Sequence, residues 1–378
     1  MSPVLKNHHN FSPYIMEDWS EFYKHRRQLP VHDSEITNGP QLSIMTYNLF
    51  TQCAKRRFRN SNGHTLEHCR YTILAHEIAT YSSDIVCLQE VSRVRLSPLE
   101  LCLQKLGYEM TYSRHSTANT MAICYKKDLF TKVTSEVQYY SDAIEHGCVE
   151  HNCALLLSLK FTEEFLQGHS VPSKKGLIIV NTHLPCQDYS WERKSHRTAV
   201  LLKFIKKFEQ KCFTDDGLTN CYRFVAGDFN VTARDPAYLA LVSKPVKISP
   251  YFQKESPGLL QMADLHNNID LRAISLYSVG YDHVDSTNSG IDNERNEPAF
   301  SFWGPNWQGL LDYIFIVCDW CGDDRTKVDT LEEFTQASNV KLLALLRMPR
   351  KNEMDGSLPQ VGMYPSDHLC MMADVELI

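Results

Sequence analysis

The sequence predicts an α/β fold built as a sandwich of mixed β-sheets. Apolar runs of strand length recur from residue 42 to residue 377, and they are too numerous for one small sheet. Amphipathic helical patterns separate only some of these runs, and several runs follow one another directly. This order favours a mixed α/β sandwich over the strict alternation of strands and helices in a Rossmann array.

The first 40 residues differ in character from the rest of the chain. They are polar, contain histidines and prolines, and end in the turn-forming segment ITNGPQ at residues 36–41. We expect residues 1–40 to be a partly disordered leader with one short helix within residues 16–29. Residues 41–378 are then expected to form a single domain.

The predicted elements of that domain follow in chain order. The strands are rich in Ile, Val, Leu, Tyr and Phe, and they cover residues 42–50, 84–91, 121–127, 153–161, 176–184, 222–230, 310–317 and 369–377. Apolar side chains in residues 64–81 recur mostly at spacings of three, four and seven, which predicts a helix. Residues 190–211 predict a second helix, with Ala199, Leu202, Ile205 and Phe208 on one face and a solvated face of lysines.

The bulk composition narrows the class of protein. Hydrophobic residues make up 43% of the chain and charged residues 22%, as in a soluble globular protein. The formal net charge is -6, so a phosphate-rich ligand would need local positive charge or a metal ion. No apolar run is long enough to span a membrane, and the N-terminus resembles neither a signal peptide nor a transit peptide. We therefore expect the protein in the cytoplasm, the nucleus or both.

The 13 cysteines are scattered through apolar stretches without the spacing of a disulfide framework. We interpret them as reduced and mostly buried thiols. Cys318 and Cys321 have the spacing of a redox or zinc pair, but no second pair or histidine cluster accompanies them. They are interpreted as two thiols at the end of a strand.

Polar side chains recur where the predicted strands begin or end. They are Asn48, Glu90, His183, Asp228, Asn230, Asp312, Asp367 and His368. One such residue alone is most simply a turn or cap residue. The same residue types at the ends of several separate strands indicate a shared rim, because sheet packing would bring these ends together. Strand alternation also predicts that Asp228 and Asn230 share one face while Phe229 points away.

This set of side chains suits metal-assisted hydrolysis of a phosphate ester. Converging carboxylates would repel one another unless a cation lay among them, and their hard oxygens favour Mg²⁺ or Mn²⁺ over zinc. The histidines could donate hydrogen bonds to phosphate oxygens, and the asparagines could orient water or ligand without adding charge. A carboxylate that positions or deprotonates the attacking water completes the requirements.

Short motifs in the order YNLF, LQEV, NTHL, GDFN, LDYIF and SDH resemble those of the exonuclease/endonuclease/phosphatase superfamily. Over residues 40–378 the chain is most similar to the branch of Ccr4-type deadenylases, nocturnin, Angel and the yeast Ngl proteins. Residues 48–71 and 81–91 resemble the Ngl RNA exonucleases most. The resemblance implies a DNase I-like, four-layer α/β sandwich with two packed mixed sheets flanked by helices. It also makes residues 41–378 the catalytic domain.

The resemblance assigns some of the polar residues to metal binding. Glu90 would be a magnesium ligand, and Asn48 would lie beside it in the network around metal and phosphate. Asp367 is similar to the second metal-binding carboxylate of the family. The implied cofactor is Mg²⁺, with Mn²⁺ as a possible substitute.

The remaining polar residues would act on the phosphate and the water. His183 matches the histidine that contacts the scissile phosphate, and Asp228 matches the residue that orients or activates the attacking water. Asn230 would support the phosphate through its amide. His368 would lie on the phosphate and be oriented by Asp312.

Further residues are candidates for binding the substrate. Trp307 lies five positions before the aspartate of LDYIF, where deadenylases of this branch carry an aromatic residue on which adenine stacks. It could equally close the loop against the sandwich. Arg56, Arg57 and Arg59 form the densest basic patch near a motif and could contact a nucleic-acid backbone or be a solvated loop. Pro185 is much closer to its histidine than the corresponding family proline, which argues against strict poly(A) preference.

The sequence thus predicts a Mg²⁺-dependent 3′→5′ RNA exonuclease that hydrolyses phosphodiester bonds of single-stranded RNA to 5′-mononucleotides. Deadenylation and RNA 3′-end processing both fit, and the choice of RNA over DNA follows from the resemblance alone. The alternative is a nocturnin-like phosphatase that acts on a dinucleotide phosphate or another small phosphomonoester. A catalytically silent RNA-binding or scaffold protein would lack some metal or phosphate residues, and here each expected position is filled. The expected partners are single-stranded RNA 3′ ends and no membrane, with the protein a monomer.

Overall fold

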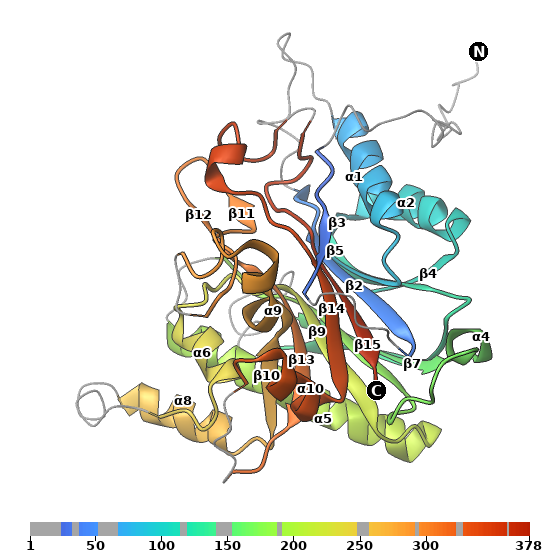
Figure 1. The fold of residues 1–378 in the computed structure, drawn as a ribbon, viewed down its shortest axis with the longest axis vertical. Coiled ribbons are helices and arrows are strands. Elements are labelled where there is room, and N and C mark those ends of the chain that lie inside the picture. The colour runs from blue at the N-terminus through green and yellow to red at the C-terminus, as the bar shows by residue number, and fades with distance from the viewer. Residues whose placement is uncertain are drawn as a thin grey trace, which may run out of the picture.

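A computed structural model describes residues 24–31, 38–51, 67–113, 119–140, 153–186, 191–247, 257–291, 295–322, 328–360 and 363–378. Two β-sheets pack face to face at its centre, and helices cover their outer faces (Figure 1). The layers therefore run helix, sheet, sheet, helix. The predicted four-layer α/β sandwich is confirmed.

The first sheet has seven strands. In sheet order they are β1 (Gln28–Pro30), β14 (Val340–Leu346), β15 (Met371–Leu377), β2 (Gln41–Asn48), β3 (Ile85–Ser92), β5 (Asn119–Lys126) and β4 (Tyr108–Tyr112). Only β2 and β3 are parallel neighbours. The register of β3 against β5 shifts between Leu88 and Val91, which is a β-bulge at the end of the strand.

The second sheet has six strands. Their order is β10 (Leu271–Ser275), β13 (Asp312–Asp319), β9 (Cys221–Asp228), β8 (Gly176–His183), β7 (Cys153–Phe161) and β6 (Phe130–Tyr139). β8 and β9 are parallel, and every residue of both strands is buried. Their continuous apolar runs suit central strands that are covered on both faces. A small hairpin of β11 (Phe302–Trp303) and β12 (Gln308–Gly309) stands apart from the two sheets.

The helices close the outer faces of the sandwich. α1 (Glu67–Tyr81) and α2 (Arg93–Lys105) lie on the seven-stranded sheet, and α5 (Trp191–Asp216) lies on the six-stranded sheet with α6 (Pro236–Val242) and α8 (Pro257–Asn267) beside it. α9 (Leu276–Asp285) and α10 (Leu331–Ser338) contact strands of both sheets, and α4 (Glu163–Leu166) follows β7. The helices predicted over 64–81 and 190–211 are confirmed by α1 and α5.

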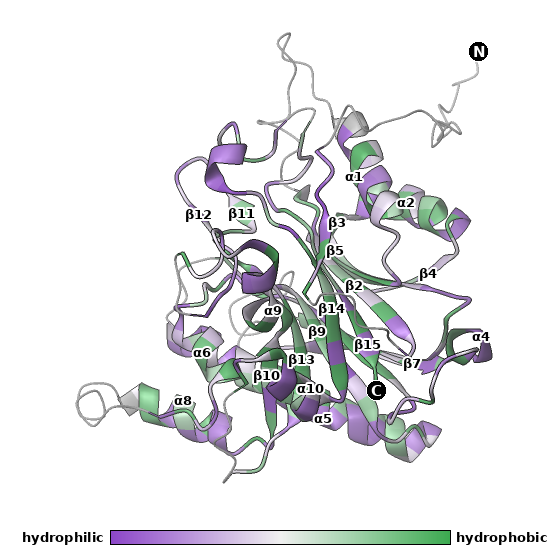
Figure 2. Ribbon diagram, in the orientation of Figure 1, coloured by the Kyte–Doolittle hydropathy of each residue, from purple (hydrophilic) through white to green (hydrophobic). Residues whose placement is uncertain are grey.

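Two apolar clusters hold these layers together. The larger fills the space between the sheets and continues beneath α5, where Ala199, Leu202, Ile205 and Phe208 are all buried as their spacing predicts. The smaller lies between the seven-stranded sheet and the helices α1 and α2. Figure 2 shows the same division, with hydrophobic strands inside and hydrophilic faces on the outer helices. No helix in the described ranges has both the length and the apolar character to span a membrane.

Part of the expected leader joins the seven-stranded sheet. Gln28, Leu29 and Pro30 pair with β14 as an edge strand, so the helix expected within residues 16–29 is wrong for its described residues 24–29. The edge of β14 offers unpaired backbone groups that an extended segment can satisfy. Arg26 is buried here, and its guanidinium donates a hydrogen bond of 2.7 Å to the carbonyl oxygen of Cys370.

Candidate active site

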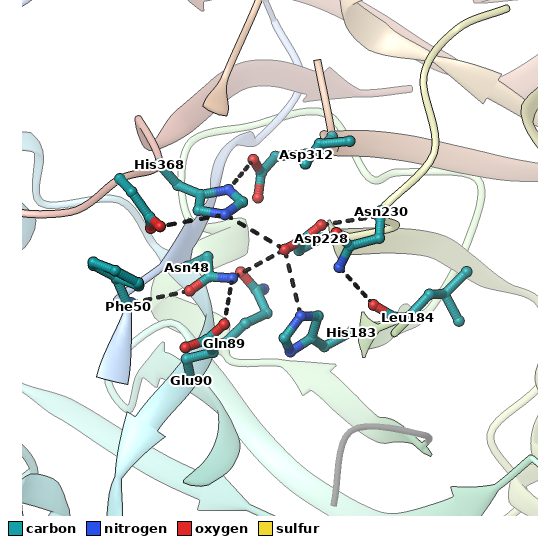
Figure 3. A network of polar contacts seen from close by, with 12 residues as sticks. Asn48, Phe50, Gln89, Glu90, His183, Leu184, Asp228, Asn230, Asp312 and His368 are labelled. Carbon is teal, nitrogen blue, oxygen red and sulfur yellow. Dashed lines mark hydrogen bonds and ion pairs between the residues drawn. The ribbon is translucent and has the colours of Figure 1, made fainter. Parts of the chain in front are cut away.

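The two parallel strand pairs place the predicted polar residues at one edge of the sandwich. Asn48 ends β2 in the first sheet, and His183 and Asp228 end the neighbouring strands β8 and β9 in the second. The register pairs His183 with Asp228 across β8 and β9, and it pairs Asp312 with Asp228 across β13 and β9. Backbone pairing therefore brings His183, Asp228 and Asp312 together, and the packing of the two sheets adds Asn48, as Figure 3 shows.

Asp228 is the centre of this network. Its Oδ2 accepts a hydrogen bond of 3.0 Å from Asn48 Nδ2 and lies 3.4 Å from His183 Nε2 and 3.6 Å from His368 Nε2 (Figure 3). The backbone N–H of Phe50 donates to Asn48 Oδ1 at 3.0 Å, which turns the Asn48 amide nitrogen toward Asp228. Burial raises the pKa of Asp228, while the charge of His368 opposes the rise.

His368 is held by a buried carboxylate. Its Nδ1 lies 2.7 Å from Asp312 Oδ2, and the hydroxyl of Ser301 donates to the same oxygen at 2.7 Å. Burial alone would lower the pKa of His368, but the carboxylates of Asp312 and Asp228 raise it well above its ordinary value. The imidazole is thereby oriented, with its Nε2 facing Asp228, and the two carboxylates favour its protonated form. Sequence reasoning missed Ser301, which lies in a loop without any periodic pattern.

Glu90 is aimed into the site by the bulge in β3. It has a left-handed backbone conformation with φ of 52°, which is rare for a residue other than glycine. Its Oε2 accepts a hydrogen bond of 3.0 Å from the backbone N–H of Thr51, and its Oε1 lies 3.4 Å from Asn48 Nδ2. Strained backbone of this kind is concentrated at functional sites.

The acidic residues of the site fit a divalent cation. One polar atom from each of Asp228, Asp312 and His368 lies within 4.8 Å of the others, but His368 and Asp312 already share a hydrogen bond, so the neighbouring carboxylates remain for a cation. Asp367 is buried, its Oδ1 has no hydrogen-bond donor among the described residues, and that oxygen lies 3.9 Å from His368 Nε2. Burial raises the pKa of Asp367 to about 7, and the carboxylates of Glu90 and Asp228 add to the rise. Poorly neutralised carboxylates that converge in this way provide the hard oxygens that Mg²⁺ and Mn²⁺ prefer.

Asn230 enters the site differently from the prediction. β9 ends at Asp228, and Asn230 has a left-handed conformation with φ of 48°, so strand alternation does not relate the two residues. Instead the backbone N–H of Asn230 donates to Asp228 Oδ1 at 2.9 Å, and its amide donates to the carbonyl of Leu184 at 2.6 Å. Phe229 is fully buried and packs its ring 5.2 Å from that of Phe315. Because the side chain of Phe229 is buried in the core, the chain turns at this point. The turn places the backbone N–H of Asn230 beside the carboxylate of Asp228.

A buried amide pair joins the two sheets directly behind the site. Asn181 of β8 donates to the carbonyls of Leu88 at 2.8 Å and Ala122 at 2.9 Å, both in the opposite sheet. Gln89 of β3 donates to Asn181 Oδ1 at 2.8 Å and to Thr46 Oγ1 at 3.0 Å. This bridge fixes how the two sets of strand ends face each other. Sequence reasoning missed Asn181 and Gln89, because each is followed directly by the polar residues of a motif, Thr182 and His183 in β8 and Glu90 in β3.

Trp307 lies at the tip of the β11 and β12 hairpin and is 48% exposed. Its ring packs 5.8 Å from that of Phe302, and a side chain at Gly309 would collide with the indole at 2.5 Å. Phe302 in turn lies 5.0 Å from the His368 ring, so an aromatic path runs from the surface to the site. The predicted backbone contacts Arg56, Arg57 and Arg59 lie outside the described residues.

The geometry is that of a class of protein: a hydrolase of phosphate esters built on a two-sheet sandwich. The model of the Endonuclease/Exonuclease/phosphatase family matches residues 45–368 of the chain. The chain belongs to that family, and it is a hydrolase that acts on phosphodiester bonds.

The chain is also similar in sequence or fold to individual proteins. The chain is 33% identical, in an alignment of 415 positions, to "RNA exonuclease NGL2" of Saccharomyces cerevisiae, across 92% of this chain and 81% of that protein. Among solved structures, the fold is similar to ANGEL2 in complex with adenosine-2′,3′-vanadate, with a TM-score of 0.62, 19% identity and coverage of 93% and 99% of the two chains. It is also similar to the human Nocturnin catalytic domain, with a TM-score of 0.56, 19% identity and coverage of 93% and 98%. At these identities the two structures support the fold alone.

Proposed function

We propose that this protein is a Mg²⁺-dependent 3′→5′ exonuclease that hydrolyses single-stranded RNA to 5′-mononucleotides. The observation that carries the proposal is the convergence of Asn48, His183 and His368 on one carboxylate oxygen of Asp228. The relative named RNA exonuclease NGL2 supports RNA as the substrate. Deadenylation and trimming of other RNA 3′ ends both remain within the proposal.

Five residues of the site have defined tasks in this reaction. Asp228 orients the attacking water and accepts its proton, because its Oδ2 faces the centre of the network. His183 and the charged His368 donate hydrogen bonds to the phosphate oxygens, where negative charge develops in the transition state. Glu90 and Asp367 are the proposed holders of Mg²⁺, which would neutralise phosphate charge and polarise the phosphorus–oxygen bond.

The hairpin offers a place for the terminal base. The half-exposed indole of Trp307 presents a flat aromatic face, and Phe302 supports it from the side of His368. Stacking of one base on an aromatic side chain contributes about 1–3 kcal/mol and tolerates any base. We propose that Trp307 holds the base next to the scissile phosphate, which sets a preference for unpaired 3′ ends.

Digestion of labelled RNA tests the proposal. An RNA with a 5′ label should shorten stepwise in the presence of Mg²⁺, while the same RNA with a 3′ label should release a labelled 5′-mononucleotide at the first turnover. A chelator should stop both reactions, and the DNA of the same sequence should be cut much more slowly. Internal fragments from a circular RNA, or equal rates with chelator, would contradict the proposal.

A nucleotide phosphatase is the second candidate function. The same residues can hydrolyse a small phosphomonoester, and the half-buried hairpin would bind its base equally well. Release of inorganic phosphate from a dinucleotide phosphate, with no shortening of any RNA, would establish this alternative. Binding of RNA without release of any product would instead indicate a catalytically silent protein.

A further inference from the structure

Arg70 is a buried arginine in the first turn of α1 that has no task in the proposed reaction. No part of its side chain is exposed. Burial of a guanidinium costs free energy, and the helix dipole opposes a positive charge near the N-terminus of a helix. An arginine at so unfavourable a position indicates a specific use of its N–H groups.

The guanidinium of Arg70 binds three backbone carbonyls. Its Nη1 donates to the carbonyl oxygen of Leu49 at 2.5 Å and to that of Pro365 at 3.3 Å, and its Nη2 donates to that of Phe50 at 3.0 Å. The central carbon of the guanidinium lies 4.8 Å from the centre of the Tyr71 ring, which is a cation–π contact. The planar fork thus joins the turn after β2 to the segment that precedes β15.

Two of these carbonyls belong to the peptide units that orient residues of the site. The carbonyl of Leu49 shares a peptide unit with the N–H of Phe50, which donates to Asn48 Oδ1 at 3.0 Å (Figure 3). The carbonyl of Phe50 shares a peptide unit with the N–H of Thr51, which donates to Glu90 Oε2 at 3.0 Å. A trans peptide unit is planar, and its C=O and N–H point in opposite directions. The guanidinium therefore fixes the directions of both N–H groups.

The backbone of this turn is strained. Phe50 has a left-handed conformation with φ of 53°, which costs about 1–2 kcal/mol for a residue other than glycine. The charge-assisted hydrogen bonds from Arg70 stabilise the turn in this conformation. Without them, relaxation of Phe50 would rotate the two peptide units and turn their N–H groups away from Asn48 and Glu90.

The third carbonyl connects a further carboxylate of the site to the same turn. Pro365 lies two residues before Asp367. The hydroxyl of Ser366, between them, donates to the carbonyl oxygen of Asn48 at 2.6 Å. Glu90 and Asp367, the proposed holders of Mg²⁺, are therefore both attached to backbone that one guanidinium holds.

We propose that Arg70 is a positioning residue for the hydrolysis, which holds Asn48 and Glu90 in the orientation that the reaction requires and fixes Asp367 beside them. The proposal rests on the proposed function for its kinetic test but not for its geometry. Misplacement of a reacting group by about 1 Å can lower a rate about a hundredfold. Loss of a contact that supports a metal ligand lowers activity about 10–100-fold.

Kinetics of Arg70→Lys and Arg70→Met on labelled RNA with Mg²⁺ test the proposal. Lysine keeps the charge but lacks the fork that holds neighbouring carbonyls, so kcat should fall roughly tenfold in Arg70→Lys. In Arg70→Met, kcat should fall roughly a hundredfold. KM for the RNA should be unchanged in both, because the buried guanidinium does not reach the substrate. Each rate is measured well below the unfolding midpoint of its variant.

Arg223→Met is the matched control. Arg223 is also buried, and it lies near the start of β9, at the opposite end of that strand from Asp228. It likewise donates three hydrogen bonds, to the carbonyl of Val317 at 3.1 Å, to Glu209 at 2.9 Å and to Asp319 at 2.7 Å. Its replacement should lower the unfolding midpoint but leave kcat unchanged.

Three kinetic results would overturn the proposal. Wild-type kcat in Arg70→Lys and Arg70→Met would show that Arg70 acts on stability alone. An equal fall of kcat in Arg223→Met would show that any buried arginine has the same effect. A rise of KM without a fall of kcat would make Arg70 a substrate-binding residue. If Arg70→Met does not fold, Arg70→Lys alone carries the comparison.

A crystal structure of Arg70→Lys gives a readout that is independent of RNA hydrolysis. The hydrogen bonds from Phe50 to Asn48 and from Thr51 to Glu90 should be broken or lengthened. If both are intact, Arg70 does not position these side chains and the proposal is overturned. If the wild type hydrolyses no RNA, the proposed function fails, and this structure still decides the role of Arg70.

Discussion

The carboxylate of Asp228 contacts side chains from both sheets. Its negative charge can be tested separately from the size of the side chain. Replacement by Asn keeps the size and most of the hydrogen-bonding capacity but removes the negative charge and the proton acceptor. We expect Asp228→Asn to lower the rate of RNA hydrolysis roughly a thousandfold. The thermal unfolding midpoint, measured in parallel, should remain close to that of the wild type. A rate within about tenfold of the wild type would remove Asp228 from the reaction.

The backbone conformation that directs the Glu90 carboxylate into the site lowers the stability of the fold. The left-handed backbone of Glu90, with φ of 52°, costs about 1 kcal/mol that glycine would not incur. Glu90→Gly and Glu90→Ala both remove the carboxylate, so both should lose activity. Only Glu90→Gly removes the strain of the left-handed backbone at residue 90. The free energy of unfolding of Glu90→Gly in urea should therefore exceed that of Glu90→Ala by about 1 kcal/mol. Equal stability of the two variants would show that the backbone relaxes here.

The buried acid Glu297 should make stability depend on pH. Its pKa is raised from 4.5 to about 7 by burial, so its favourable contribution is complete below the unfolded value and is lost as pH rises through about 7. Between about pH 5.5 and about pH 8, the wild type should lose about 2 kcal/mol of unfolding free energy relative to Glu297→Gln. Urea titrations at the two pH values measure this. A difference between wild type and variant that does not change with pH would contradict it.

At the scale of elements, local patterns explain what the sequence could predict. α1 and α5 follow from helical periodicity, and β8 and β9 from continuous apolar runs. The polar residues at the ends of the strands could be predicted as a group, because an apolar run ends at each of them. β1 could not be predicted, since its pairing depends on the exposed edge of β14, which is far away in the sequence.

The details of the site depend on tertiary contacts that no local pattern contains. Ser301 orients Asp312 from a loop, and the bulge of β3 turns Glu90 inward. The turn at Asn230 arises because Phe229 enters the core. Gly227 allows this end of β9 to approach β8, because a Cβ there would lie 2.0 Å from the carbonyl oxygen of Thr182. These features depend on contacts between residues that are far apart in the sequence or on the packing of the core.

The bridge between β3 and β8 predicts a coupled pair of substitutions. Asn181→Leu removes the donor to two buried carbonyls and a partner of Gln89, so it should destabilise the fold by about 2 kcal/mol. Gln89→Leu should also be destabilising. The double variant should cost clearly less than the sum, because both ends of one buried hydrogen bond are then apolar. Chemical unfolding measures all three, and strict additivity would show that the amides act independently.

At the scale of the whole molecule, the candidate metal site spans the interface of the sandwich. Glu90 and Asp367 belong to the seven-stranded sheet and its connections, while Asp228 belongs to the six-stranded sheet. Burial is the main cause of the raised pKa of Asp367, and the carboxylates of Glu90 and Asp228 add to the rise, so the ionised form of Asp367 opposes the packing of the two halves. A cation bound among them should therefore stabilise the fold as a whole.

Thermal unfolding of metal-stripped protein tests this coupling. Mg²⁺ at about one hundred times its dissociation constant should stabilise the wild type by about 2.7 kcal/mol, since it binds the folded state only. The unfolding midpoint should rise by roughly 5 °C. Without metal, Asp367→Asn should be at least as stable as the wild type at about pH 8, because one repelling charge is gone, yet Mg²⁺ should no longer raise its midpoint. An equal rise in the wild type and in Asp367→Asn would place the ion elsewhere. The proposed arrangement requires the metal-free variant to be at least as stable as the wild type and to show no rise with Mg²⁺.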